Sequence, residues 1–171
     1  MFMGAYLPLL HYVSKQQGLI HSETTYYQFN AILPPDTKYE AREAFLADDL
    51  LRIQYLETYS ATLSAEALQI ISDLGKRKTG KFVIYKLLKD RAVWFDEEDN
   101  LYMVRELSDP LENMLPEVPC LVEATIFPFF NEILFDGFLR PYSIKFGPGL
   151  KKGYREKYLK AKDAGQIVRS M

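Results

Sequence analysis

The chain has 171 residues, of which 48% are apolar and 26% are charged. This size and composition fit one globular domain with a sizeable core, and they exclude a disordered or collagen-like chain. The net charge of −2 conceals two opposed parts. Residues 140–171 hold nine Lys and Arg against two Asp and Glu, a charge of +7, whereas residues 1–139 hold twelve against twenty-one, a charge of −9.

The chain has one cysteine, Cys120, which excludes an intramolecular disulfide and a cysteine-based zinc site. Because Cys120 lies in an apolar run, we expect a small buried side chain rather than a nucleophile. No stretch approaches the ~20 apolar residues of a membrane span, and the N-terminal segment lacks the basic region of a signal peptide. We therefore expect a cytoplasmic protein that makes no membrane contact.

The first part of the chain has the apolar period of helices. Tyr6–Val13 predicts a short helix, and a stronger pattern predicts one continuous helix over residues 39–59. Ser64 has a side chain that is favoured at a helix N-cap, so it predicts the start of a third helix. We expect this part of the chain to be helical and acidic.

After Gly80 the apolar period shortens from about 3.6 residues to 2, the period of β-strands. Residues 82–85 are a compact β-prone run. Residues 92–95 and 101–104 are two further apolar runs with a polar, five-residue connection between them. Such a pair predicts a β-hairpin.

The last third of the chain continues this pattern and then ends in a helix. A strand is predicted over residues 121–127, and Asp136-Gly137 predicts a tight turn between two further apolar runs. Residues 142–146 alternate apolar and polar side chains, which predicts one more strand. A basic helix is predicted over residues 150–164, with Leu150, Tyr154, Tyr158 and Ala161 on its packing face.

These elements together predict an α+β fold. The helical part, residues 1–79, is expected to pack on an antiparallel β-sheet or small barrel formed by residues 80–171. The basic C-terminal helix closes the structure. We find no internal repeat and no clear linker, so we predict a single domain over residues 1–171.

Several segments resemble a group of uncharacterised bacterial proteins. Some members of this group carry an added SEC-C-type zinc-binding tail, which is absent here, so the resemblance implies neither a zinc site nor an activity. It covers nearly the whole chain and is sharpest between residues 120 and 162. The matching segments include Tyr6–Val13, Leu63-Ser64, Gly80–Tyr85, Phe127–Phe129, Ile133–Gly137, Pro141–Ile144, Phe146-Gly147 and Tyr158–Lys162.

Two carboxylates are weak candidates for catalysis. Glu123 interrupts an apolar run, so it is either a buried acid with a shifted pKa or the exposed side of an edge strand, and we favour the exposed side. Asp136 precedes Gly137, and turn geometry is a sufficient explanation for this pair. Neither residue has an identifiable catalytic partner in the sequence.

The sequence gives no reason to expect a metal or a cofactor. His11 and His21 are ten residues apart and lack the spacing of a metal-binding pair on a helix. The acidic run over residues 96–99 lacks the spacing and the interior glycine of an EF-hand loop. We interpret this run as a solvated turn.

The start of the C-terminal helix is the candidate anion site. Free backbone N–H groups at a helix N-terminus attract anions, and nearby lysines add formal charge. The segment matches neither the phosphate-loop pattern nor the dinucleotide pattern, and we favour a plain helix start with solvated lysines. The candidate anion-binding residues are Gly147, Gly149, Lys151, Lys152 and Arg155.

The leading functional hypothesis is a non-catalytic binding or assembly module. Its basic C-terminal segment would meet an anionic ligand, a protein partner or the acidic helical half of the same chain. One alternative is an enzyme that acts on a phosphate-bearing substrate, with Lys151 and Lys152 on the anion and Glu123 or Asp136 as the base. Nucleic-acid binding is a further alternative, and the sequence pI near 5.8 weighs against it.

Overall fold

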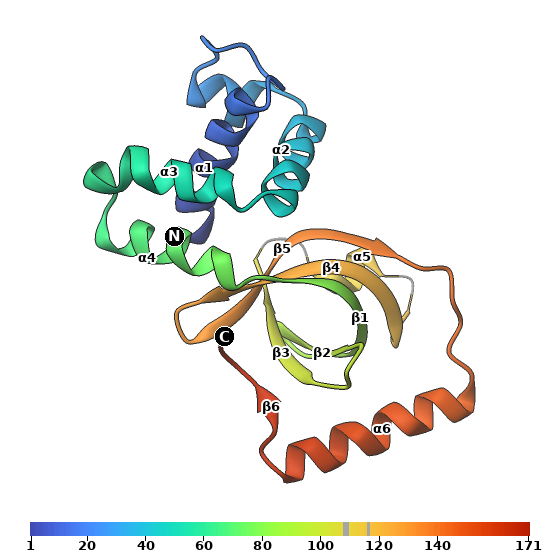
Figure 1. The fold of residues 1–171 in the computed structure, drawn as a ribbon. Helices are drawn as coiled ribbons and strands as arrows, with labels where there is room; N and C mark the ends of the chain where they lie inside the picture. Colours follow the sequence, from blue (N-terminus) through green and yellow to red (C-terminus); the bar gives the residue numbers. More distant parts are fainter. Residues whose placement is uncertain (108–109, 116) are drawn as a thin grey trace. The chain divides into compact units, whose positions relative to one another are not determined.

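The computed structural model describes residues 1–107, 110–115 and 117–171, and these form two units, residues 1–75 and residues 76–171 (Figure 1). The first unit is helical, whereas the second contains a six-stranded sheet and a C-terminal helix. The prediction of an α+β fold is therefore confirmed. The boundary between the two units follows residue 75, four residues before the expected boundary after residue 79. The prediction of a single domain concerns how the two units pack together, and it stays a prediction.

The helical unit has its core around the first helix. Leu9, Leu10 and Val13 are fully buried on one side of this helix, and the ring of Tyr6 lies 6.0 Å from the ring of Phe45. The N-cap prediction at Ser64 is confirmed, because its Oγ accepts a hydrogen bond from the backbone N–H of Ala67. The helices are α1 (Phe2–Gln16), the π-helix η1 (Gln28–Ile32), α2 (Pro35–Ala47), α3 (Leu50–Tyr59), the 3₁₀-helix η2 (Ser60–Thr62), α4 (Ala65–Asp73) and the 3₁₀-helix η3 (Leu74–Lys76).

The prediction of one helix over residues 39–59 is wrong, because the chain breaks between α2 and α3. Asp48 leaves the helical region with φ −136° and ψ 103°, and its carboxylate accepts a hydrogen bond from the backbone N–H of Leu50. Asp competes in this way with the helical backbone bonds. Leu50 and Ile53, which follow the break, are exposed, whereas Phe45 before the break is fully buried.

The second unit is built around a closed five-stranded barrel. Strands β1, β2 and β3 form a meander, β4 pairs antiparallel with β1, and β5 returns between β4 and β3. The pairing of β2 with β3 closes the ring, which is the five-stranded Greek-key architecture of the OB-fold. The strands are β1 (Lys78–Leu87), β2 (Arg91–Asp96), β3 (Leu101–Glu106), β4 (Cys120–Phe129), β5 (Glu132–Pro141) and β6 (Ile167–Val168).

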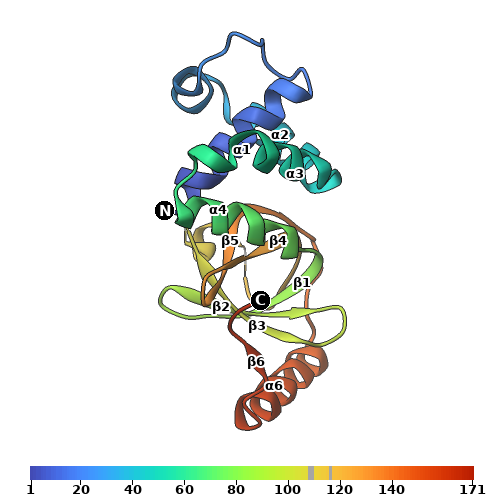
Figure 2. The ribbon, with the colours of Figure 1, turned by 60° about the vertical axis from the view of Figure 1, so that its left-hand side comes forward.

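The sheet is mixed rather than wholly antiparallel. β3 pairs parallel with β5 along its second half and parallel with β6 along its first half. The short β6 therefore pairs with the part of β3 that β5 does not reach. In the chain, β6 follows helix α6 (Pro148–Asp163) (Figure 2). A short helix, α5 (Leu111–Met114), lies between β3 and β4 in sequence.

Two details of the predicted β region are wrong. Asp136-Gly137 is no turn but a bulge within the continuous strand β5, where Gly137 has φ +92° and the register to β4 shifts. The pair Asp136-Gly137 suggested a turn because Gly readily takes a left-handed backbone, and a bulge needs that conformation as much as a turn does. The strand predicted over residues 142–146 is absent, since β5 ends at Pro141 and irregular chain leads from there to α6.

The strands of the barrel alternate between an inner and an outer apolar layer. Trp94, Val104, Val122 and Phe135 are among the fully buried side chains of the interior, and Cys120 is buried with them as predicted. The outer layer lies over β1, β2 and β3 and includes Val93, Phe95 and Leu101, together with residues of α6.

Candidate functional site

Helix α6 is fixed to the outer surface of the barrel by a narrow seam. The ring of Tyr154 lies 5.0 Å from the ring of Phe95, and the ring of Tyr158 lies 5.4 Å from that of Tyr85. Ala161 is the buried residue of the helix itself. Three of the four residues predicted for this packing face are therefore correct, whereas Leu150 is exposed.

Some of the basic side chains of α6 are paired within the second unit. Lys157 places its Nζ 2.6 Å from both carboxylate oxygens of Asp99, at the turn between β2 and β3. Lys151 lies 3.8 Å from Glu117, and Lys152 lies 3.9 Å from Glu156 one turn along the helix. The short contact to Asp99 attaches α6 to the β2–β3 turn as well as to the outer apolar layer.

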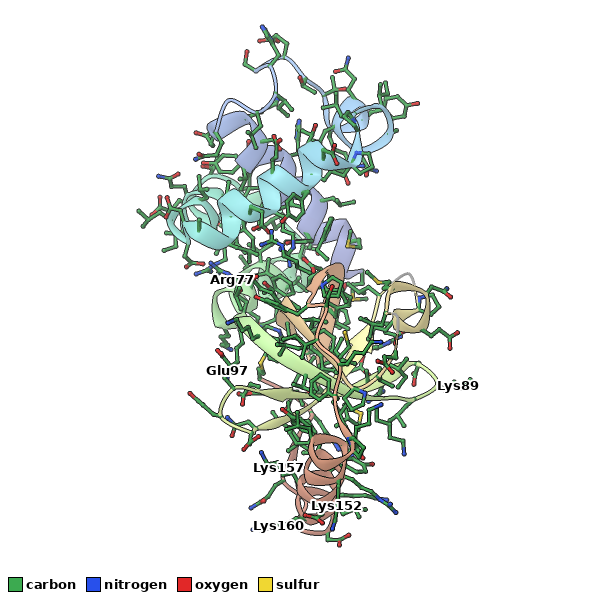
Figure 3. The ribbon with its side chains drawn as sticks, turned by 90° about the vertical axis from the view of Figure 1, so that its right-hand side faces the viewer. Arg77, Lys89, Glu97, Lys152, Lys157 and Lys160 are labelled. Atoms are coloured by element: carbon green, nitrogen blue, oxygen red, sulfur yellow. The ribbon has the colours of Figure 1, made fainter. Side chains whose placement is uncertain are left out.

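Three basic residues and one leucine of α6 face solvent in a row that we call the α6 stripe: Lys152, Arg155, Leu159 and Lys162. At 100° per residue they lie within an arc of about 80°, and ten residues of helix are ~15 Å long. All four side chains are exposed. Among the described residues, Arg155 and Lys162 have no ion-pair partner. Figure 3 shows Lys152 at the solvent side of the helix.

A hollow of about 510 Å³ lies beside the second half of α6. The β2–β3 turn and the start of β3 form one side of it, and the second half of α6 with Gln166 forms the other. Lys157 and Asp99 both line this hollow and contact each other, so the positive charge of Lys157 is already paired there. The lining residues are Asp99, Asn100, Leu101, Lys157, Lys160, Ala161 and Gln166.

The predicted anion site lies on the first two turns of α6. Gly147 is the N-cap, without a capping side chain, and Pro148 occupies the first turn. Lys151 and Lys152 each lie near a carboxylate instead of converging on the helix end, and Arg155 belongs to the α6 stripe. Gly147, Gly149, Lys151, Lys152 and Arg155 thus share one end of one helix, and anion binding there stays a prediction.

The two catalytic candidates lie on β4 and β5. Glu123 is on the outside of the barrel, where Arg140 lies 3.7 Å from its carboxylate and Tyr142 donates a hydrogen bond of 3.4 Å to it. Its side chain is exposed, as the favoured interpretation expected, but the expected edge strand is wrong, because β4 pairs with β1 on one side and with β5 on the other. Asp136 is buried in the β5 bulge and accepts a hydrogen bond from the backbone N–H of Phe138.

The acidic run over residues 96–99 contains one residue that the sequence did not single out. Asp96 is buried and accepts hydrogen bonds from Lys78, from Tyr102 and from Asn100. Burial raises the pKa of this carboxyl, but the hydrogen bonds outweigh burial and lower the pKa from 3.8 to about 2. The same contact raises the pKa of Lys78. Only the pairing of β1 with β2 shows that Lys78 reaches this turn.

The described residues contain no group of three His, Cys, Asp or Glu side chains that could hold a metal ion. Burial lowers the pKa of His11, whose Nε2 lies 2.9 Å from the carbonyl oxygen of Thr24. Burial also raises the pKa of the Cys120 thiol, which disfavours the reactive thiolate. In the described ranges, no helix is long and apolar enough to cross a membrane.

A comparison of the chain with protein-family models finds no match, and neither the curated proteins nor the solved structures give a significant match. The resemblance to bacterial proteins with a SEC-C-type tail therefore stays a prediction. The site is defined by its own geometry, which is a basic helix held rigidly on a closed barrel.

Proposed function

We propose that the protein is a non-catalytic binding module that binds an acidic protein surface along the α6 stripe. The observation that carries this proposal is the exposed row of Lys152, Arg155, Leu159 and Lys162 on a helix whose opposite seam is packed on the barrel. The seam and the contact of Lys157 with Asp99 hold the helix in place, so the stripe has a fixed geometry.

The composition of the stripe favours a protein partner over a nucleic acid. Leu159 is exposed between Arg155 and Lys162, and Glu156 and Asp163 border the row. An apolar side chain ringed by charges is typical of protein–protein interfaces, in which an apolar centre is surrounded by a polar rim. A phosphate backbone would instead favour an unbroken row of cations.

A charge-reversal experiment tests this proposal. We expect Arg155→Glu combined with Lys162→Glu to weaken binding of a 20-residue poly-L-glutamate peptide at least tenfold in a calorimetric titration at low salt, because complementary charges become like charges. The matched control is Lys81→Glu combined with Lys89→Glu, which makes the same charge change at two exposed positions outside α6.

Both variants should keep the circular dichroism of the native protein, since neither changes a buried side chain. Equal affinity of the α6 variant and the native protein for the peptide would contradict the proposal. A single-stranded oligonucleotide that competes for α6 more strongly than the peptide would favour the nucleic-acid alternative instead.

A further inference from the structure

Helix α3 packs by one side and leaves an apolar and acidic side in solvent. Leu50 is 60% exposed, Ile53 is 40% exposed, and Glu57, one further turn along, is exposed as well. At 100° per residue these three side chains lie within an arc of about 60°. Leu51 and Tyr55, on the other side of the helix, are buried. We call Leu50, Ile53 and Glu57 the α3 face.

The acids of this region are available to an external cation. Residues 48–57 contain three Asp and Glu against one Arg. That arginine, Arg52, is occupied by Asp49, whose carboxylate accepts hydrogen bonds of 2.6 and 3.0 Å from the guanidinium group. In the part of the chain that the structure describes, neither Asp48 nor Glu57 has an ion-pair partner. An unpaired acid therefore lies toward each end of α3.

The α6 stripe has the complementary order of side chains. Its exposed leucine, Leu159, follows Arg155 by four residues and precedes Lys162 by three. On the α3 face, the acid follows Ile53 by four residues, and the second apolar side chain precedes Ile53 by three. Each row spans seven residues, which is ~10.5 Å of helix. The two spacings coincide when the helices run in opposite directions.

We propose that the α6 stripe binds the α3 face of a second copy of this chain, with the two helices antiparallel. Leu159 then packs on Ile53, and Arg155 meets Glu57 one turn away. An apolar centre with charges at its rim is the usual build of a protein interface. This inference rests on the proposed function, because it names the acidic protein surface that the stripe binds. Charge complementarity identifies the occupant, since the chain itself exposes the acidic and apolar pattern that the stripe fits.

The antiparallel direction follows from the charges. It places Lys162 at the start of α3, where the carboxylate of Asp48 accepts a hydrogen bond from the helix backbone. The parallel direction would instead place Arg155 opposite Asp49, whose carboxylate is already bonded to Arg52. The contact uses different surfaces on the two copies, and every copy carries both surfaces.

Sedimentation equilibrium of the whole protein at about 20 mM salt tests this contact, because exposed charges are weakly screened there. We expect the mean mass of the native protein to rise above that of one chain as the protein concentration increases. Glu57→Lys should raise the dissociation constant at least tenfold, because Arg155 then meets a like charge. The matched control is Glu40→Lys, the same charge change at an exposed position of α2, which should stay within twofold of the native protein.

A charge swap separates this contact from a general effect of charge. A chain that carries both Glu57→Lys and Arg155→Glu has the net charge of the native protein and regains the ion pair with its charges reversed. Its dissociation constant should return to within threefold of the native value. All the changed side chains are exposed, so each variant should keep the circular dichroism of the native protein.

Three results would overturn the inference. They are a native protein that stays monomeric up to about 0.5 mM, equal losses of association in Glu57→Lys and Glu40→Lys, and no recovery in the double variant. Failure of the proposed function is seen separately, because Glu57→Lys leaves α6 unchanged and should bind poly-L-glutamate at least as tightly as the native protein. Peptide binding through α6 by a monomeric native protein contradicts only this inference. Peptide binding that survives Arg155→Glu with Lys162→Glu contradicts the proposed function.

Discussion

Asp96 ends β2 and organises the turn that follows it. Its Oδ1 accepts hydrogen bonds from the backbone N–H groups of Glu98 and Asn100, both at 2.9 Å. Its Oδ2 accepts from Lys78 and from Tyr102, on the two strands that flank β2. One buried carboxylate therefore joins three strands and the β2–β3 turn.

We expect Asp96→Asn to lower the free energy of unfolding by about 2 kcal/mol, because hydrogen bonds to a charged group are the stronger ones and Lys78 loses its counter-charge. Urea denaturation followed by the fluorescence of Trp94 measures this loss. Glu97→Gln, at the exposed neighbouring position, should change the value by less than ~0.5 kcal/mol.

The same carboxylate makes stability depend on pH in the acid range. The pKa of Asp96 is lower in the folded protein than its ordinary value, so the stabilisation is complete above about pH 3.8 and is lost as the pH falls toward 2. The Asp96→Asn variant should lack this part of the acid unfolding profile. A variant with the same acid profile as the native protein would show that the contact with Lys78 does not stabilise the fold.

At the scale of the elements, local signals predicted most of the fold. The cap at Ser64, the β2–β3 hairpin and the spacing of the packing residues within α6 each depend on residues close in sequence. The break at Asp48 and the bulge at Gly137 were missed, because Asp and Gly serve both the expected and the observed backbone conformation.

The long-range features of the second unit and of its site could not be predicted. Parallel pairing of β3 with β5 brings Arg105 next to Glu132, and no periodicity contains that information. The sequence did not single out Phe130, because its exposure depends on the position of the turn between β4 and β5. The basic character of α6 was visible in the composition, but which cations are paired depends on the position of Asp99 and Glu117.

Two glycines of the second unit should respond oppositely to alanine. Gly137→Ala places a side chain at φ +92° and should lower the free energy of unfolding by more than about 1 kcal/mol. Gly153 lies inside α6, where an added Cβ meets no atom within 4 Å, so Gly153→Ala should raise stability by roughly 0.5–1 kcal/mol. Chemical denaturation compares both with the native protein, and a neutral Gly137→Ala would contradict the role given to the bulge.

At the scale of the whole molecule, charge is divided between the two units. The helical unit holds four Lys and Arg against nine Asp and Glu, a charge of −5, and the second unit holds seventeen against fourteen, a charge of +3. The net charge of −2 therefore understates the electric field around each unit. Molecules with such a division can attract one another even when their net charges are alike.

We expect this attraction to appear as a negative second virial coefficient in static light scattering at 20 mM salt and pH 7. Raising the salt to 0.3 M shortens the screening length, so the coefficient should rise toward zero or above. Arg155→Glu with Lys162→Glu should make it more positive at low salt. Repulsion that weakens with added salt in the native protein would show that net charge governs these encounters instead.

The pairing of β6 with β3 has a consequence for how α6 meets a partner. The helix is joined to β5 at one end and to β6 at the other, so it is a closed loop of chain rather than a free tail. A partner would find the helix already formed, and little conformational entropy would be lost on binding. The outward residues of α6 can therefore be exchanged to alter specificity while the fold beneath them stays the same.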